Sequence, residues 1–366
     1  MHASALAGAP ALLADMDAAA QAHGLAVPAG IVSHTGVGGL TLGGGMGWLT
    51  RKHGLTVDNL LSAEIVTADG QILRASPEEH ADLFWAIRGG GGNFGVVTAF
   101  EFQAHEVGPI VQFGLFFWGL EQGAEALRLA QDVLDSLPRE VTAISAGLNA
   151  PPAPFVPAEF HFQPGYALLL VGFGSAEEHA AVAGQIREHL PSLFEVVTPM
   201  PYVALQQLFD EAGAWGLFGY EKGIQISRVS DEAIDAITTN VPRRTSPMSN
   251  VLLYPLSGAY SEVDDDATAF GGGRSPCLDV VINAATTDPE ALAAERAWVR
   301  SFWNALKPYG ISVGGYVNEM TEYEEDRIKA SYGPTKYDRL ARIKAVYDPE
   351  NMFHRNANIK PAKTPA

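Results

Sequence analysis

The sequence predicts an α+β protein of about two domains. Its 366 residues exceed the usual length of one domain, and 47% of them are hydrophobic, which is enough for a sizeable buried core. Strand-like runs and amphipathic helical stripes both occur along the chain. The two longest glycine-rich segments lie in the first third, and the composition changes near Gly108-Pro109. We therefore expect a first unit rich in glycine and a second unit of ordinary strands and helices.

The charge balance argues against binding to nucleic acid or to a membrane surface. The chain has 42 acidic and 24 basic residues, a formal net charge of −18, which repels phosphate groups. The uncharged stretch Val107–Leu120 is shorter than the roughly 20 residues that span a bilayer. Met1–Leu13 lacks the positive charge of a signal peptide, so we expect a soluble cytoplasmic protein.

Neither cysteine nor the acidic residues indicate a metal site. The single cysteine, Cys277, excludes an intrachain disulfide and a cysteine-based zinc site. It lies in the apolar run Cys277–Ala285, where a small buried side chain is the simplest interpretation. Glu262 and the acidic residues 264–266 lack the spacing of a calcium loop, and we interpret them as a solvated loop.

The first third predicts a hairpin, a helix and a strand, in that order. Two strand-like runs flank Asp69-Gly70, which is a strong hairpin signal. Ser76–Glu79 has the residues of a helix start, so we expect a helix from there to about Arg88. Val96–Gln103 alternates apolar and polar residues as a strand does, with its phenylalanines on one face.

The segment after Gly108-Pro109 predicts three amphipathic helices and three strands. Apolar residues recur at helical spacing in each helix, and a proline follows its last turn. The tail, Thr321–Ile359, predicts two further helices and an asparagine-rich ending. The helical stripes are Leu127–Leu137, Val182–Leu190 and Leu292–Leu306, and the strand-like runs are Tyr166–Val171, Val251–Tyr254 and Cys277–Ala284.

Two glycine-rich segments are the strongest functional signal. Residues 36–47 read GVGGLTLGGGMG, and residues 89–95 read GGGGNFG. Backbone without Cβ atoms adopts positive φ, points N–H groups at an anion and lets a flat ring approach closely. Tight turns are the alternative interpretation, but this many glycines in two short segments favours a ligand cradle.

Common nucleotide and hydrolase signatures do not explain these glycines. The string Gly90-x-Gly92-x-x-Gly95 matches the dinucleotide fingerprint, but here the predicted helix precedes it and the predicted strand follows it. A Rossmann phosphate site needs the opposite order, so we exclude one. The chain also has no GxxxxGK[ST] loop, no G-x-S-x-G elbow and no HExxH motif.

Tyr316 and Glu319 are the leading candidates for proton transfer. The segment 314–319 looks strand-like, and the spacing of Tyr316 and Asn318 places them on one face. A tyrosine with an acid nearby accepts a proton from a substrate hydroxyl, whereas the commoner case is a tyrosine with a satisfied hydroxyl at a sheet edge.

Three other polar residues are weaker candidates. Asn356 and Asn358 repeat the same-face spacing, and their amides either bind the polar edge of a ring or cap the final turns. His34 precedes the first glycine-rich segment, where it is either a polar contact to a ligand or a solvated side chain.

Together these motifs resemble a known family. The segments GIVSHTGVGGLTLGGGMGWLTRKHGLTVDNLLSAEIVTADG and DLFWAIRGGGGNFGVVTAFEF are similar to the FAD-binding domain of the berberine-bridge-enzyme-like FAD-linked oxidases, in the vanillyl-alcohol-oxidase superfamily. YVNEM and YDPENMFHRNANI resemble the family's C-terminal segment. The resemblance implies the second subdomain of a PCMH-type FAD-binding domain at 1–107, with the N-terminal subdomain largely absent. It also implies a substrate domain with an antiparallel sheet and flanking helices at 108–313, and a segment at 314–366 that returns to the first domain.

The resemblance also implies a chemistry and a set of site residues. A hydride would pass from an alcohol, sugar, phenol or amine carbon of a small-molecule substrate to flavin N5, with molecular oxygen as the final acceptor. Tyr316 is the first choice for the proton acceptor and Glu319 is the reserve. The residues expected near FAD are His34, Gly36, Gly38, Gly39, Gly43, Gly44, Gly45, Gly47, Gly92, Asn93, Gly95, Val97, Asn318, Asn356 and Asn358.

The chain departs from the family's pattern at three places. Relatives have a first FAD subdomain with a histidine that links to the flavin, and residues 11–28 resemble only the end of that subdomain. Val32 stands where some relatives have a second linking cysteine, so we expect non-covalent FAD. Glu319 stands where several plant relatives have a tyrosine base. The alternatives are a non-catalytic truncated remnant and a ligand-binding α+β protein.

Overall fold

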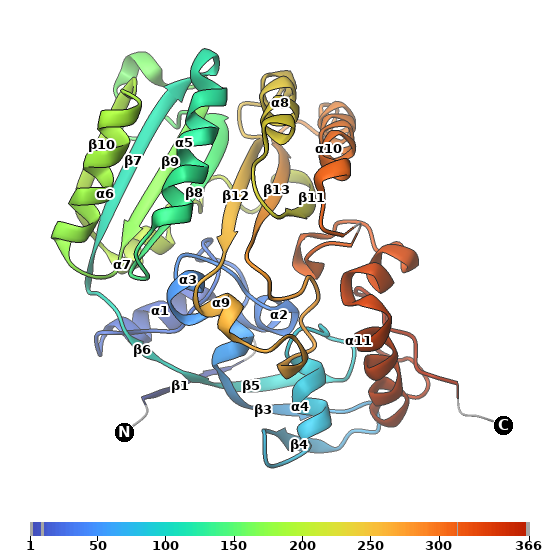
Figure 1. The fold of residues 1–366 in the computed structure, drawn as a ribbon. Helices are drawn as coiled ribbons and strands as arrows, with labels where there is room; N and C mark the ends of the chain where they lie inside the picture. Colours follow the sequence, from blue (N-terminus) through green and yellow to red (C-terminus); the bar gives the residue numbers. More distant parts are fainter. Residues whose placement is uncertain (1–2, 9–10, 313, 364–366) are drawn as a thin grey trace.

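The computed structural model describes residues 3–8, 11–312 and 314–363, which form two units built on antiparallel sheets. Figure 1 shows a large sheet with its helices in the upper part of the molecule and a smaller sheet in the lower part. Because helices and antiparallel strands lie in separate layers, the predicted α+β class is confirmed. Among the described helices, none combines the length and the apolar character that a membrane crossing requires.

The first unit contains a four-stranded sheet in the order β1-β5-β3-β4. β3 and β4 form the hairpin predicted around Asp69-Gly70, and β5 coincides with the predicted strand. A bulge between β3 and β5 changes the alternation, so Val97, Phe100 and Phe102 all face the core. The strands are β1 Ser4–Gly8, β3 Leu60–Val66, β4 Ile72–Ala75 and β5 Val96–Gln103, and a small sheet pairs β2 Leu25–Ala26 with β6 His105–Glu106.

Four short helices and the C-terminal helix complete the first unit. α11, Glu325–Tyr347, lies near the C-terminus but packs on the first unit. Its Leu340 and Ile343 belong to the same hydrophobic core as α4. Gly333, at φ 68°, interrupts α11, so the tail contains the two predicted helical parts. The four short helices are α1 Leu13–Gln21, α2 Val37–Gly43, α3 Thr50–His53 and α4 Ala81–Ile87.

The second unit contains a seven-stranded sheet in the order β10-β7-β9-β8-β12-β13-β11. Every pair in it is antiparallel. The three strands predicted in this region correspond to β9, β12 and β13. The bounds are β7 Ile110–Gly119, β8 Val141–Asn149, β9 Pro164–Gly172, β10 Phe194–Pro201, β11 Phe218–Ile226, β12 Asn250–Leu256 and β13 Cys277–Thr286.

Helices cover one face of this large sheet and leave the other face for the functional site. α5, α6, α8 and α10 lie side by side on the covered face (Figure 1), where Leu127, Ile186 and Val299 of the predicted stripes are buried. The bounds are α5 Gly123–Ser136, α6 Ala176–His189, α8 Asp231–Asn240 and α10 Leu292–Leu306, and two shorter helices are α7 Tyr202–Gln206 and α9 Ala259–Glu262.

The predicted start of the helix near Ser76 is wrong by several residues. The Ser76 hydroxyl does accept hydrogen bonds from the N–H groups of Glu78 and Glu79, at 3.2 and 3.1 Å. These bonds close a turn, however, because His80 adopts φ 51° and interrupts any continuous helix. α4 therefore begins at Ala81.

Two segments that carry candidate site residues also differ from the prediction. Most of the first glycine-rich segment is the helix α2 rather than a loop, and only Gly44 and Gly45 have positive φ, at 143° and 79°. The segment 314–319 is not a strand. Val317–Glu319 is a single 3-10 turn, after which Met320 forms a bridge to β11.

Candidate active site

A cavity of about 730 Å³ lies between the first glycine-rich segment and the open face of the large sheet. Of the residues predicted from the sequence, Gly36, Gly39, Tyr316, Asn318 and Glu319 line it. A Cβ atom on Gly36 or Gly39 would find no other atom within 4 Å, so the backbone there is open. The volume is typical of a small-molecule site.

Strand register makes the opposite wall of the cavity polar. Residues that pair across neighbouring strands project to the same face of a sheet, and every second residue repeats that face. On β11, β12 and β13 this rule gathers carboxyl, amide and phenol groups in an otherwise apolar sheet. Glu221, Asn250, Tyr254 and Asn283 line the cavity. The two cross-strand rows are Glu221–Asn283–Asn250 and Gln225–Asp279–Tyr254.

Glu319, at this wall, lies within hydrogen-bonding reach of Asp279, and both carboxyl groups are buried. Asp279 is 0% exposed and Glu319 is 7% exposed. Gly223 makes room for the contact, because a Cβ atom there would lie 2.2 Å from Glu319 Oε2. Both oxygens of Asp279 and Oε2 of Glu319 find no donor among the described residues. A proton shared between the two carboxyl groups satisfies these atoms and removes the cost of two adjacent buried charges.

Burial and neighbouring negative charge make this cluster titrate unusually. Burial raises the pKa of Glu319 well above its usual range, and Asp279 and Glu221 raise it further, against a smaller opposing effect of Arg327. Burial raises the pKa of Asp279 to about 6 and the pKa of Glu221 to about 7. Carboxyl groups that exchange protons near neutral pH are suited to proton transfer.

The Tyr316 hydroxyl is hydrogen-bonded to the first glycine-rich segment. It accepts hydrogen bonds from the Gly45 N–H, at 2.6 Å, and from Asn318 Nδ2, at 2.7 Å. Asn318 Nδ2 also donates to the Leu40 carbonyl, at 2.9 Å. Burial raises the pKa of Tyr316, so its phenol stays protonated at neutral pH. Through these hydrogen bonds Tyr316 and Asn318 hold the first glycine-rich segment, residues 36–47, in place. This segment is called the glycine wall of the cavity below.

Four of the predicted glycines, Gly43, Gly44, Gly45 and Gly47, lie behind the cavity, where they allow close packing. A Cβ atom on Gly43 would lie 2.0 Å from Asn318 Oδ1, and one on Gly44 would lie 2.7 Å from the ring of Phe270. A Cβ atom on Gly47 would lie 2.0 Å from a backbone oxygen of Ala29. These glycines support the site by letting its neighbours approach.

We expect Gly45→Ala to lower the free energy of unfolding by about 2–4 kcal/mol. Gly45 has φ +79°, and its Cβ would lie 2.1 Å from Thr56 Oγ1. Thermal and urea unfolding check this result. Gly184→Ala is the matched control, because Gly184 lies within α6 and a Cβ atom there meets nothing within 4 Å. The control should gain stability from its higher helix propensity. Equal effects of the two changes would contradict the packing role of Gly45.

The second glycine-rich segment joins the first one to the C-terminal residues. The Leu42 carbonyl accepts hydrogen bonds from the N–H groups of Gly89 and Gly91, at 3.0 and 2.9 Å. Asn93 is fully buried, and its Oδ1 accepts a hydrogen bond from the Ile359 N–H at 3.0 Å. The two glycine-rich segments and the asparagine-rich ending are therefore joined by hydrogen bonds into one region of the first unit.

Several buried polar atoms in this region have no hydrogen-bond partner within the described part of the chain, as expected where a large polar cofactor binds. The Oδ1 atoms of Asn356 and Asn358 are buried and have no donor among the described residues, and Thr41 Oγ1 is in the same state. A Cβ atom on Gly92 would lie 3.7 Å from Asn356 Nδ2, which brings these two predicted residues together. Because buried polar groups normally have partners, these atoms and the open glycine backbone are consistent with the predicted FAD site.

The four remaining predicted cofactor contacts, His34, Gly38, Gly95 and Val97, also lie away from the cavity lining. His34 turns toward the residues that follow α7, where its ring packs 5.7 Å from that of Trp215. Gly38 lies within α2, and a Cβ atom on Gly95 would lie 2.5 Å from a β3 carbonyl oxygen. Val97 is 5% exposed and belongs to the core, because the bulge in β5 turns its side chain inward.

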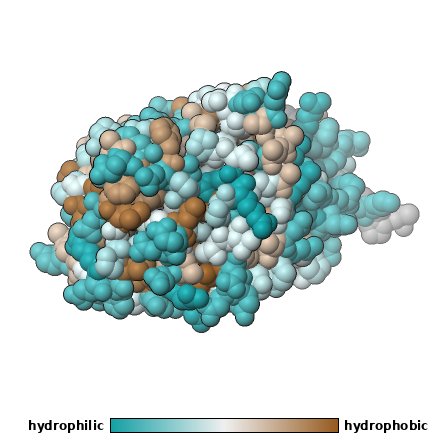
Figure 2. All heavy atoms as spheres, turned by 90° about the horizontal axis from the view of Figure 1, so that it is seen from above, coloured by the Kyte–Doolittle hydropathy of each residue, from teal (hydrophilic) through white to brown (hydrophobic). Residues whose placement is uncertain are grey.

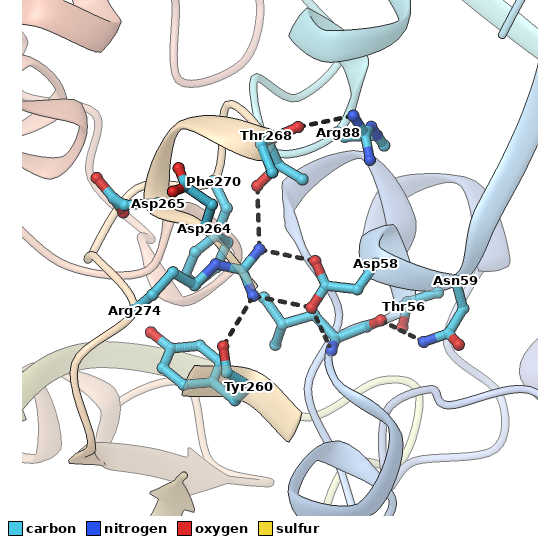
Figure 3. A network of polar contacts seen from close by, with 12 residues as sticks. Thr56, Asp58, Asn59, Arg88, Tyr260, Asp264, Asp265, Thr268, Phe270 and Arg274 are labelled. Carbon is cyan, nitrogen blue, oxygen red and sulfur yellow. Dashed lines mark hydrogen bonds and ion pairs between the residues drawn. The ribbon is translucent and has the colours of Figure 1, made fainter. Parts of the chain in front are cut away.

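A buried ion pair fixes the loop that supports Tyr316. Arg274 forms two hydrogen bonds with Asp58, at 2.7 and 2.8 Å, and a third with Thr268, at 3.0 Å (Figure 3). The Arg274 and Asp58 side chains are only 4% and 6% exposed. Phe270, from the same loop as Arg274, packs 5.8 Å from the ring of Tyr316. The pair thereby ties this loop of the second unit to the glycine-rich region of the first.

Sequence reasoning missed Asp279 and Glu221. Each is a single carboxylate inside an apolar strand, in CLDVVINAAT and FGYEKGIQI respectively. An isolated charge in a buried strand is costly unless it is paired or functional, and the sequence offered this signal at Asp279, whereas Glu221 is followed directly by Lys222. The sequence did not reveal that these two residues lie near Glu319. That arrangement depends on the pairing of β11 with β13 and on the 3-10 turn at Val317–Glu319.

Two protein-family models match the chain. The model described as FAD binding domain matches residues 2–76, and the model described as berberine and berberine like matches residues 315–360. The first match starts near the beginning of the chain and does not clearly support the predicted absence of a first FAD subdomain. The second match includes Tyr316, Glu319, Asn356 and Asn358.

Individual proteins are similar to nearly the whole chain. An FAD-linked oxidoreductase of Dictyostelium discoideum is 31% identical over 353 residues, which are 95% of this chain and 74% of that protein. The (R)-6-hydroxynicotine oxidase of Paenarthrobacter nicotinovorans is 29% identical over 358 residues, which are 95% of this chain and 75% of that protein. A crystal structure of 6-hydroxy-D-nicotine oxidase from Arthrobacter nicotinovorans has a TM-score of 0.83 and 25% identity, and the match covers 98% of this chain and 79% of that one.

Proposed function

The chain belongs to the berberine-bridge-enzyme-like family of FAD-linked oxidoreductases, and on this premise we propose that it oxidises a small molecule at a carbon that bears a hydroxyl or amine group. The observation that carries this proposal is Glu319, which lines the cavity and is paired with the fully buried Asp279. Oxidation of such a carbon releases a proton from the hydroxyl or amine, and this pair is placed to receive it. Family membership decides against the ligand-binding alternative.

The residues that we propose to hold FAD come from three segments of the chain. The open backbone at Gly36 and Gly39, the amide of Asn318, and the unpartnered amide oxygens of Asn356 and Asn358 provide the contacts. When bound, FAD supplies the two-electron acceptor for the substrate carbon, and we propose molecular oxygen as the final acceptor.

We propose that Glu319, rather than Tyr316, takes the substrate proton. Glu319 lines the cavity, has an unpartnered oxygen, and shares its environment with Asp279 and Glu221, so loss of its proton changes the charge of a coupled cluster. Tyr316 was the first choice from the sequence, but burial raises the pKa of its phenol, which outweighs the opposite effect of the Gly45 and Asn318 hydrogen bonds and keeps the phenol protonated at neutral pH. Its proposed task is to hold the glycine wall against the cavity.

Anaerobic reduction tests the proposed function. The FAD-containing protein is mixed with single alcohols, sugars, phenols and amines in the absence of oxygen, and the flavin absorbance is followed. We expect bleaching by at least one of these classes and recovery of the absorbance when air is admitted. No bleaching by any class would contradict the proposal and favour the non-catalytic alternative.

We expect the FAD of this chain to be non-covalent. None of the described residues that line the cavity is a cysteine or histidine, and Val32, which lines it, has no nucleophilic atom. Acid precipitation of the protein should leave the yellow colour in the supernatant. Colour that remains in the washed pellet would show a covalent link.

A further inference from the structure

A second cavity, of about 790 Å³, lies beside the first one. Phe209, Ala212 and Asn250 line both cavities, so the two spaces meet at these residues. The second cavity lies under the proline-rich loop that follows β8. Two backbone hydrogen bonds close the base of this loop, from the Ala150 N–H to the Gln163 carbonyl at 2.9 Å and from the Phe162 N–H to the Ala150 carbonyl at 2.8 Å.

The second cavity is more apolar than the first. Its floor consists of aromatic and aliphatic side chains of β7, β9 and β10, such as Phe113, Phe117 and Phe194. Among the described residues that line it, Glu211 is the one with a charge. Phe155 and Phe162 of the loop also line it, although they are 40% and 56% exposed. Seen from above, hydrophobic residues gather among hydrophilic ones on the side of the molecule where these strands lie (Figure 2). Such a surface gains free energy when an apolar ligand covers it.

We propose that the second cavity binds the apolar body of the substrate while its hydroxyl or amine end lies in the first cavity. The substrate class is therefore an amphipathic alcohol or amine with an alkyl or aryl portion several carbon atoms long. This inference rests on the proposed function, because it takes the carboxyl cluster of Glu319 as the place of the reacting end. Because Phe209 and Ala212 line both cavities, the two spaces are adjacent, as a molecule that occupies both requires.

Binding of n-alkylamines from butylamine to decylamine tests the inference by calorimetry on the FAD-containing protein. Each methylene buried in an apolar cavity strengthens binding about fourfold, so the dissociation constant should fall by this factor for each added carbon until the cavity is full. Calorimetry reports binding whether or not the flavin is reduced.

Two variants fill the second cavity without altering the first. Ala204→Trp and Ala153→Trp change residues that line only the second cavity, one from α7 and one from the loop. We expect both to reduce the gain to less than about 1.5-fold per carbon and to leave the affinity for butylamine within about twofold of wild type. Ala180→Trp, an exposed position on α6, is the matched control and should keep the full chain-length dependence.

The results separate this inference from the proposed function. A chain-length dependence that persists in both filled variants, or that is absent in the wild type, overturns the inference even if another compound bleaches the flavin. A dependence that is present in the wild type and the control, and lost in both filled variants, supports the second cavity as the binding site. If chain-length dependence behaves in this way but no compound reduces the flavin, the proposed function is overturned and the binding role of the second cavity stands.

Discussion

Glu319→Gln is expected to lower the rate of anaerobic flavin reduction by about 10²–10⁴-fold, which is the usual loss when a general base is removed. Glutamine has nearly the shape of glutamate and cannot accept the substrate proton. Since Glu319 is 7% exposed and lines the cavity, the change acts where substrate binds. Stopped-flow absorbance with saturating substrate measures the rate, and the concentration dependence measures substrate binding, which should change much less.

Two further variants make this result specific. Glu188→Gln changes an exposed glutamate on α6 and should leave the rate unchanged. Tyr316→Phe removes the acceptor of the Gly45 and Asn318 hydrogen bonds and should lower the rate less than tenfold, mainly by disturbing the glycine wall. If Tyr316→Phe instead loses most of the rate while Glu319→Gln reduces normally, the two assignments must be exchanged.

Arg274→Met is expected to lower the free energy of unfolding by about 3–5 kcal/mol, because it leaves the Asp58 carboxylate buried without its charged partner. Leu55 N–H, which donates to Asp58 at 2.8 Å, cannot replace the lost charge. Since the loop of Arg274 also carries Phe270, which packs against Tyr316, FAD affinity should fall together with stability. Urea unfolding and a flavin titration measure the two effects.

The exposed pair of Arg128 and Asp231 provides the control for this effect. Its side chains are 52% and 75% exposed, so Arg128→Met should change stability by less than about 1 kcal/mol. The double variant Asp58→Asn with Arg274→Met should recover part of the loss, because it removes the unpaired charge. A loss of similar size in both arginine variants would contradict the structural role assigned to the buried pair.

Much of the fold could be predicted because local rules and tertiary structure agree. The hairpin at Asp69-Gly70 needs only its turn residues, and the α5, α6 and α10 helices follow from apolar residues at helical spacing. The predictions failed where local signals were overruled. Ser76 provides a helix cap that is used in a turn instead. The glycines of α2 form a helix despite their low propensity, and at Gly43 the absence of a Cβ atom lets Asn318 pack closely.

The site could be predicted only on its glycine side. Gly36, Gly39, Tyr316, Asn318 and Glu319 lie in two segments whose motifs are legible in the sequence, and all of them line the cavity. The opposite wall depends on the register of β11, β12 and β13, which brings together residues about 25–60 positions apart. No local pattern contains that register, so the partnership of Asp279 with Glu319 emerged only from the structure.

The pH dependence of flavin reduction tests most directly whether the Glu319–Asp279 pair accepts the proton. With a substrate that does not titrate, we expect the wild-type rate to rise with pH through an apparent pKa well above that of an ordinary glutamate and then to level off. Asp279 and Glu221 raise the pKa of Glu319, whereas Arg327 lowers it, so removal of one negative charge in Asp279→Asn should move the profile to lower pH. A rate that is independent of pH, or that rises only in the range where a buried tyrosine ionises, would contradict the account.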